Sequence, residues 1–127
     1  KLGRTVLLNP DSHIQISNAS ALDERDALMA LSHSGRSVET VRIAELAKRR
    51  GATVIAVTGM QNNPLAELAD IRLFTVADED RVRSSAITAR DAQLMLMDML
   101  FIMLLRYQSD ANDFIHDSES AVGVFKV

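Results

Sequence analysis

The sequence predicts an α/β fold, a three-layer α-β-α sandwich with a parallel sheet, on three observations. Apolar runs of strand length alternate along the chain with capped or amphipathic helical stretches, an order that favours parallel strands joined by right-handed crossovers. The run Thr53–Thr58 is apolar without alternation, which is typical of a strand covered on both faces. Apolar residues make up 47% of the chain, which is enough for a hydrophobic core.

The same patterns place the individual elements. We expect strands over residues 5–8, 27–31, 53–58 and 71–75, and helices over residues 12–21, 38–50, 64–69, 84–106 and 110–127. Asp11 or Ser12 can cap the first helix. Gly51 follows a run of cations and is a typical helix stop. Asn63 followed by Pro64 is a typical helix start, with a capping side chain and a proline in the first helical position.

Composition narrows the class of protein and its partners. The net charge of −3 argues against nucleic acid binding by this segment, because phosphate backbones favour a basic face. The chain has no cysteine, which excludes disulfides and suits a reducing cytoplasm. We detect no signal peptide, and the longest apolar run, Leu94–Leu105, is too short for a membrane span of ~20 residues. We therefore expect a cytoplasmic protein without a membrane partner.

The stretch from Ser32 to Ser37 is the strongest candidate for a binding site. It packs three hydroxyls and Gly35 into a predicted strand-to-helix turn, where backbone N–H groups and a helix N-terminus can face an anion. Gly35 would permit an unusual backbone angle or a close approach by a ligand. The P-loop and GxGxxG patterns are absent, so ATP and dinucleotides lose support and we expect no cofactor. The alternative is that Ser37 only caps the following helix.

Hydroxyl groups follow two further predicted strands. Thr58 ends the strand at 53–58, and Ser84 and Ser85 begin the long helix after the strand at 71–75. In an open α/β sheet, ligands bind beyond the carboxyl ends of the strands. We therefore expect these hydroxyls to lie on the same edge as the serine stretch, although helix capping would also explain Ser84 and Ser85.

The ionisable residues offer weaker candidates. A carboxylate in the loop 78–81 could act as a base near a bound sugar, although such acidic loops are more often simply solvated. The histidines His13, His33 and His116 show no metal-ligand spacing. We expect no metal site and structural or surface roles for these rings, with His33 or His13 near a ligand as the alternative.

The run Leu94–Leu105 is apolar nearly all the way round, apart from Asp98. A helix of this kind must be buried on most sides. It could be a core helix, but a chain of 127 residues has limited core in which to bury it. We therefore favour a homodimer or tetramer formed through the helix at 85–106. Asp98 would need a partner such as an arginine or a helix N-terminus.

The pattern Ser32-x-Ser34-Gly35-x-Ser37 resembles the SxSGxT signature of the SIS (sugar isomerase) domain. Further stretches similar to that family, in the same order, are Glu39-Thr40, 47–52, 54–58 and 64–70. The segments 11–13 and 83–101 resemble the sugar-sensing domain of RpiR-type bacterial transcription regulators. The resemblance covers roughly residues 1–107 and implies a flavodoxin- or Rossmann-like fold whose first strand and first Gly/Ser loop have no counterpart in this sequence.

The resemblance also implies a ligand site, because the family binds a sugar phosphate at the SxSGxT turn. The residues that carry over as ligand-binding are Ser32, Ser34, Gly35, Ser37, Ser84 and Ser85. Ser37 stands where threonine is usual, which keeps the hydroxyl. Glu79 matches in position the base of the isomerase domain of glucosamine-6-phosphate synthase. Together with Thr58, these positions form the predicted site.

We expect residues 1–127 to form one partial phosphosugar-binding domain with a helical extension at 108–127. The resemblance implies the effector-sensing domain of an RpiR-type regulator, which would bind DNA only through an N-terminal helix-turn-helix domain absent from this chain. The alternative is a phosphosugar isomerase that moves a proton between C1 and C2 through an enediol, with Glu79 as the base and a histidine assisting ring opening. We favour the sensor, which is not an enzyme.

Overall fold

The computed structural model describes residues 3–77, 84–107 and 111–123 of the 127-residue chain. These residues group into two compact units, one formed by Leu7–Leu94 and the other by the described parts of Lys1–Val6 and Met95–Val127. The boundary between the units falls within the long helix α4, Ser84–Tyr107. The first unit contains the sheet and the predicted serine-rich turn.

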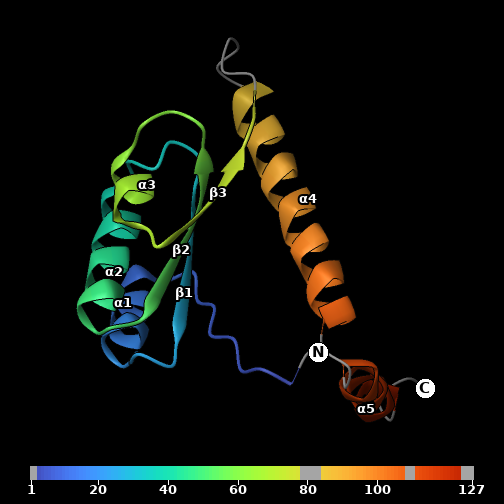
Figure 1. Cartoon of the computed structure of the whole chain (residues 1–127). Helices are drawn as coiled ribbons and strands as arrows, with labels where there is room; N and C mark the ends of the chain where they lie inside the picture. The colour runs from blue at the N-terminus through green and yellow to red at the C-terminus, as the bar shows by residue number, and fades with distance from the viewer. Residues whose placement is uncertain (1–2, 78–83, 108–110, 124–127) are drawn as a thin grey trace. The chain divides into compact units, whose positions relative to one another are not determined.

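The sheet has three parallel strands, β1 (Ala27–Ser32), β2 (Thr53–Gly59) and β3 (Ile71–Thr75), in the order β1-β2-β3 (Figure 1). The central strand β2 pairs Ala56 with Ala30 of β1 on one side, and it pairs with β3 on the other. Each of these strands lies within one residue of its predicted bounds. The predicted α/β fold with a parallel sheet and flanking helices is confirmed.

The prediction of a strand at residues 5–8, the first of the four in chain order, is wrong. Residues 5–8 form no strand in the structure, and the side chains of Val6, Leu7 and Leu8 are 82%, 67% and 93% exposed. An apolar run predicts burial, but a strand also requires a neighbour that accepts and donates its backbone hydrogen bonds. Within the described residues, the sheet holds only β1, β2 and β3, so this run has no strand beside it.

The helices agree with the sequence prediction. They are α1 (Ser12–Ser20), α2 (Val38–Arg49), α3 (Pro64–Leu68), α4, and α5 (Ala111–Gly123). Asp11 caps α1 by accepting hydrogen bonds from the N–H groups of residues 13 and 14, at 2.8 and 3.2 Å. Asn63 caps α3 by accepting from the N–H of Ala66 at 2.9 Å. Within the described ranges, no helix is long and apolar enough to cross a membrane.

The core of the first unit lies between one face of the sheet and the helices α2 and α3, which lie on the same side of it in Figure 1. Most of its members are alanines, whose small side chains let helix and strand backbones approach closely. The buried residues of this cluster are Ala30, Ala44, Ala47, Ala52, Val54, Ala56, Leu65 and Ala69. Leu65 of α3 is the largest fully buried side chain among the described residues.

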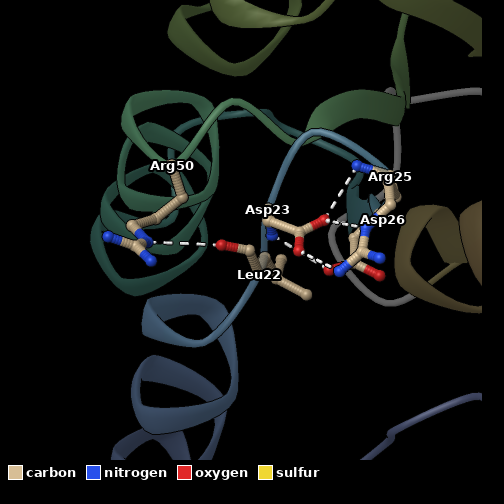
Figure 2. A network of polar contacts seen from close by, with 5 residues as sticks. All are labelled: Leu22, Asp23, Arg25, Asp26 and Arg50. Carbon is tan, nitrogen blue, oxygen red and sulfur yellow. Dashed lines mark hydrogen bonds and ion pairs between the residues drawn. The ribbon is translucent and has the colours of Figure 1, made fainter.

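A polar network fixes the loop between α1 and β1 (Figure 2). The carboxylate of Asp23 accepts hydrogen bonds from the backbone N–H of Arg25 at 2.9 Å and from its guanidinium Nη2 at 2.7 Å. The N–H of Asp23 donates to the carboxylate of Asp26 at 2.9 Å, and Arg50 Nε at the end of α2 donates to the carbonyl of Leu22 at 3.2 Å. The Arg25 hydrogen bonds lower the pKa of Asp23 to about 2.

A second ion pair lies at the same end of the unit, where α2 ends and β2 begins. Lys48 of α2 donates from Nζ to the Asp70 carboxylate at 2.9 Å and to the carbonyl of Leu68 at 2.6 Å. The other carboxylate oxygen of Asp70 accepts from the N–H of Val54 at 2.9 Å. The hydrogen bond from Lys48, followed by that from Val54, lowers the pKa of Asp70. This arrangement ties α2, the end of α3 and the start of β2 together.

The Asp23→Asn variant is expected to be less stable than the unmodified chain at neutral pH. Because the folded pKa of Asp23 lies below its ordinary value of 3.8, its contribution to stability is present above that value. It is lost as the pH falls towards about 2. The gap in unfolding free energy between the two chains should therefore close over that range, which urea titrations between ~pH 7 and ~pH 2.5 would measure.

The control for this measurement is Asp91→Asn, which alters an exposed carboxylate on α4. The gap measured for this variant shows how much of the effect comes from removing one surface carboxylate of any kind. A gap for Asp23→Asn that stays constant from neutral to acid pH would contradict the account, because it would mean that the Asp23 hydrogen bonds do not favour the ionised form.

Candidate functional site

The serine turn, defined as Ser32–Ser37, lies at the carboxyl end of β1 and leads directly into α2. The N–H of Gly35 donates to the carbonyl of Ser32 at 3.1 Å, which closes a tight turn. Gly35 has a φ of +62°, a conformation that costs an L-residue with a side chain roughly 1–2 kcal/mol. The predicted need for glycine at this position is therefore confirmed by its backbone angle.

The turn is held in place by the loop before α3. A Cβ added to Gly35 would overlap the side-chain amide of Asn63, which is 3% exposed. The carbonyl of Gly35 accepts from the N–H of Leu65 at 3.2 Å, and Arg36 Nη2 donates to the carbonyl of Asn62 at 3.0 Å. The group that makes the close approach permitted by Gly35 is therefore the Asn63 side chain of the same chain. This contact fixes the turn against the start of α3.

The hydroxyls of the turn are only partly engaged within the chain. Ser37 is the N-cap residue of α2, but its side chain makes no capping hydrogen bond; its Oγ donates to the Glu39 carboxylate at 3.3 Å. Ser34 is exposed, and its Oγ accepts from the N–H of Arg36 at 3.3 Å, which leaves its hydroxyl hydrogen available. The idea that Ser37 serves only as a side-chain cap therefore fails.

The electrostatics of the turn suit an anion, with one competing group. The N-terminus of α2 carries partial positive charge, and the exposed Arg36 lies beside it. Glu39, in the first turn of α2, accepts a hydrogen bond from the Ser37 hydroxyl at 3.3 Å. An incoming phosphate would have to displace that carboxylate from Ser37, after which the hydroxyl could donate to a phosphate oxygen.

Thr58 reaches the same edge of the sheet but is already used by the chain. Its side chain is fully buried, and its Oγ1 donates to the carbonyl of His33 at 3.2 Å. The same carbonyl accepts from the N–H of Gly59 at 2.8 Å, and Thr75 Oγ1 donates to the carbonyl of Thr58 at 3.4 Å. These contacts join the ends of the three strands. A ligand contact by Thr58 stays a prediction, but its hydroxyl hydrogen is committed elsewhere.

The structure describes the remaining predicted site residues only in part. Glu79 lies outside the described residues, as do the side chains of Ser84 and Ser85. Ser84 is the first residue of α4, which confirms the predicted start of that helix. The roles assigned to these three residues stay predictions. In the part of the chain that the structure describes, no group of three or more His, Cys, Asp or Glu side chains could hold a metal ion.

Sequence reasoning missed two contributors to the site. Asn63 was predicted only as the cap of α3, yet its amide also fills the space beside Gly35. Gly59 was not singled out, but a Cβ there would come within 2.9 Å of the His33 carbonyl. The Asn63-Pro64 helix start was a visible signal, whereas the contact with Gly35 joins segments 28 residues apart and has no local signature.

The family follows from comparison with known proteins. The SIS domain model matches residues 3–103, which include the serine turn, the whole sheet and most of α4. The chain therefore belongs to the SIS domain family, as the SxSGxT-like pattern indicated.

Solved structures show the same fold. The Vibrio vulnificus NanR protein complexed with ManNAc-6P is 25% identical, with a TM-score of 0.89 over 99% of this chain and 48% of that one. The sugar isomerase domain of an RpiR transcription factor from Sphaerobacter thermophilus is 19% identical, with a TM-score of 0.71 over 91% of this chain and 63% of that one. At this lower identity, the likeness concerns the fold alone.

A protein of Listeria monocytogenes proposed to be a sugar-phosphate isomerase is also similar. It is 26% identical, with a TM-score of 0.65 over 80% of this chain and 54% of that chain. This chain therefore spans about half the length of NanR and of the Listeria protein. The similar structures thus include one described as a transcription factor and one as a proposed isomerase.

The Gly35→Ala variant is expected to lose about 2–5 kcal/mol of stability, from the positive φ together with the overlap with Asn63. Thermal or urea unfolding would measure the loss. Gly123→Ala is the matched control, because a Cβ at Gly123 meets nothing within 4 Å. A Gly35→Ala protein as stable as the Gly123→Ala protein would show that the turn is not held in the described conformation.

Proposed function

We propose that this chain is the phosphosugar-binding, effector-sensing domain of an RpiR-type bacterial transcription regulator. The observation that carries the proposal is the serine turn, a strand-to-helix turn in which the Ser37 hydroxyl makes no capping hydrogen bond to α2. A sugar phosphate combines an anion with several hydroxyls, and both match the donors of such a turn. The resemblance of this chain to NanR, solved with ManNAc-6P, supports the same class of ligand.

In this proposal the phosphate lies at the N-terminus of α2. Backbone N–H groups of the turn and the hydroxyls of Ser34 and Ser37 donate to its oxygens, and Arg36 adds positive charge nearby. Gly35, pressed against Asn63, keeps these donors in place before the ligand arrives. Such preorganisation lowers the entropy cost of binding. Ser32, Ser84 and Ser85 are assigned to the sugar hydroxyls on the same edge of the sheet.

The sensing step is a shift of population. A ligand that binds one conformation more tightly moves the equilibrium towards it by its difference in affinity. The Ser37–Glu39 hydrogen bond offers such a difference, because it exists only where the phosphate does not occupy Ser37. DNA contacts are assigned to a helix-turn-helix domain outside these 127 residues, and a cytoplasmic location fits such a regulator.

A phosphosugar isomerase is the second candidate, favoured by the 26% identity to the proposed isomerase of Listeria monocytogenes. In that reaction Glu79 would take a proton from one of the carbons C1 and C2 of the open-chain sugar. It would return the proton to the other carbon through an enediol. The two candidates share the phosphate site and differ in whether a base acts on the bound sugar.

A Ser34→Ala/Ser37→Ala double variant tests the phosphate site. N-acetylmannosamine 6-phosphate, glucosamine 6-phosphate and fructose 6-phosphate serve as probes in thermal shift measurements. A probe at ten times its Kd should stabilise the unmodified chain by about 1.4 kcal/mol, which is roughly 5 °C in Tm. The double variant should lose most of that shift, because two donors to the phosphate are removed.

Two controls accompany this measurement. Ser17→Ala removes an exposed hydroxyl on α1 and should keep the full shift, and unphosphorylated N-acetylmannosamine should give none. An equal shift for the double variant and the Ser17→Ala variant would overturn the phosphate site.

The Glu79→Gln variant distinguishes sensor from enzyme. The sensor proposal expects that the unmodified chain does not interconvert aldose and ketose phosphates, and that Glu79→Gln binds the best probe within a few-fold of the unmodified affinity. Isomerisation is followed by NMR of the sugar protons in ²H₂O. Measurable turnover that Glu79→Gln abolishes would replace the sensor with the isomerase, because only a catalytic base accounts for that loss.

A further inference from the structure

Glu39 places a carboxylate beside the proposed phosphate position. Its side chain is exposed in the first turn of α2, and it accepts a hydrogen bond from Ser37 Oγ at 3.3 Å. Among the described residues it forms no ion pair. Arg36, the one arginine of the serine turn, donates instead to the carbonyl of Asn62 at 3.0 Å. The arginine of the turn therefore does not neutralise this carboxylate.

This carboxylate opposes the binding of a simple phosphate ester. A phosphate oxygen that accepts from Ser37 Oγ lies ~2.7 Å from it, so the phosphate is close to Glu39 even after taking its hydrogen bond. Like charges repel, and the repulsion is stronger at a protein surface than in bulk water. At ~pH 8 a phosphate monoester is a dianion whose phosphate group has no hydrogen to donate. A small ester such as methyl phosphate therefore meets only repulsion from Glu39.

A sugar phosphate offers the group that this carboxylate needs. An ionised carboxylate only accepts hydrogen bonds, and a sugar phosphate carries hydroxyls a few bonds from its phosphate. A hydrogen bond from such a hydroxyl to Glu39 is charge-assisted and about twice as strong as one between neutral groups. It replaces the hydrogen bond that Glu39 loses when the phosphate takes Ser37. The same carboxylate thus disfavours the phosphate group and favours a neighbouring hydroxyl.

We propose that Glu39 is a specificity-determining residue, whose carboxylate accepts a hydrogen bond from a hydroxyl of the bound sugar phosphate. The serine turn then selects phosphate esters with a hydroxyl close to the phosphate over phosphate esters without one. The inference rests on the proposed phosphate site at Ser34 and Ser37. It adds the residue by which that site distinguishes a sugar phosphate from other phosphate monoesters.

The Glu39→Gln variant tests this role, because glutamine keeps the size and an acceptor oxygen of glutamate and removes its charge. Amide NMR titrations at ~pH 8 measure the Kd of methyl phosphate. The same titrations measure the Kd of the tightest of N-acetylmannosamine 6-phosphate, glucosamine 6-phosphate and fructose 6-phosphate. Glu39→Gln should bind methyl phosphate about fivefold more tightly than the unmodified chain, because the repulsion is removed. It should bind the sugar phosphate no more tightly, because the loss of the charge-assisted hydrogen bond offsets that gain.

Glu45→Gln is the matched control. It removes an exposed carboxylate from the same helix, ~9 Å farther along the axis, and should leave the ratio of the two Kd values unchanged. Far-ultraviolet circular dichroism checks that both variants are folded. An equal ratio for Glu39→Gln and Glu45→Gln would overturn the specificity role and leave the phosphate site in place. An unmodified chain that binds none of the three sugar phosphates would overturn the proposed function and this inference with it.

Discussion

The contact between Gly35 and Asn63 determines what the rest of the first unit can do. Asn63 fills the space that any other side chain at position 35 would need, and the same amide caps α3. The turn therefore cannot move away from α3 without losing the hydrogen bonds that Gly35 accepts from the N–H of Leu65 and that Arg36 donates to the carbonyl of Asn62. The fully buried Leu65 in turn anchors α3 to the core. One close approach thus connects the core, the cap and the serine turn.

This constraint separates two kinds of hydroxyl at the sheet edge. Thr58 and Thr75 donate to backbone carbonyls and join the strand ends, so their hydroxyls have a structural role at the edge of the sheet. Ser34 and Ser37 lie on the turn, where neither hydroxyl hydrogen is bound to a backbone carbonyl. If a phosphate binds at the turn, as proposed, the Glu39 carboxylate would have to leave the Ser37 hydroxyl.

The sequence was a good guide wherever the signal is local. Strand bounds, the caps at Asp11 and Asn63, and the stop near Gly51 depend on side chains close to the backbone groups they satisfy. Residues 5–8 show the limit, because the same apolar pattern does not reveal whether a neighbouring strand exists. The serine turn was found from its hydroxyls. Its support by Asn63 was not, because that contact depends on how distant segments pack in three dimensions.

Amide NMR during a titration with inorganic phosphate tests the central claim most directly, because every sugar phosphate shares that group. The account predicts that the largest ¹H–¹⁵N shift changes fall on Gly35 to Thr40, at the turn and the first turn of α2, while the amides of α1 stay in place. Shift changes confined to other segments, with the amides of residues 35–40 unmoved at saturating phosphate, would contradict the assignment of the serine turn as the phosphate site.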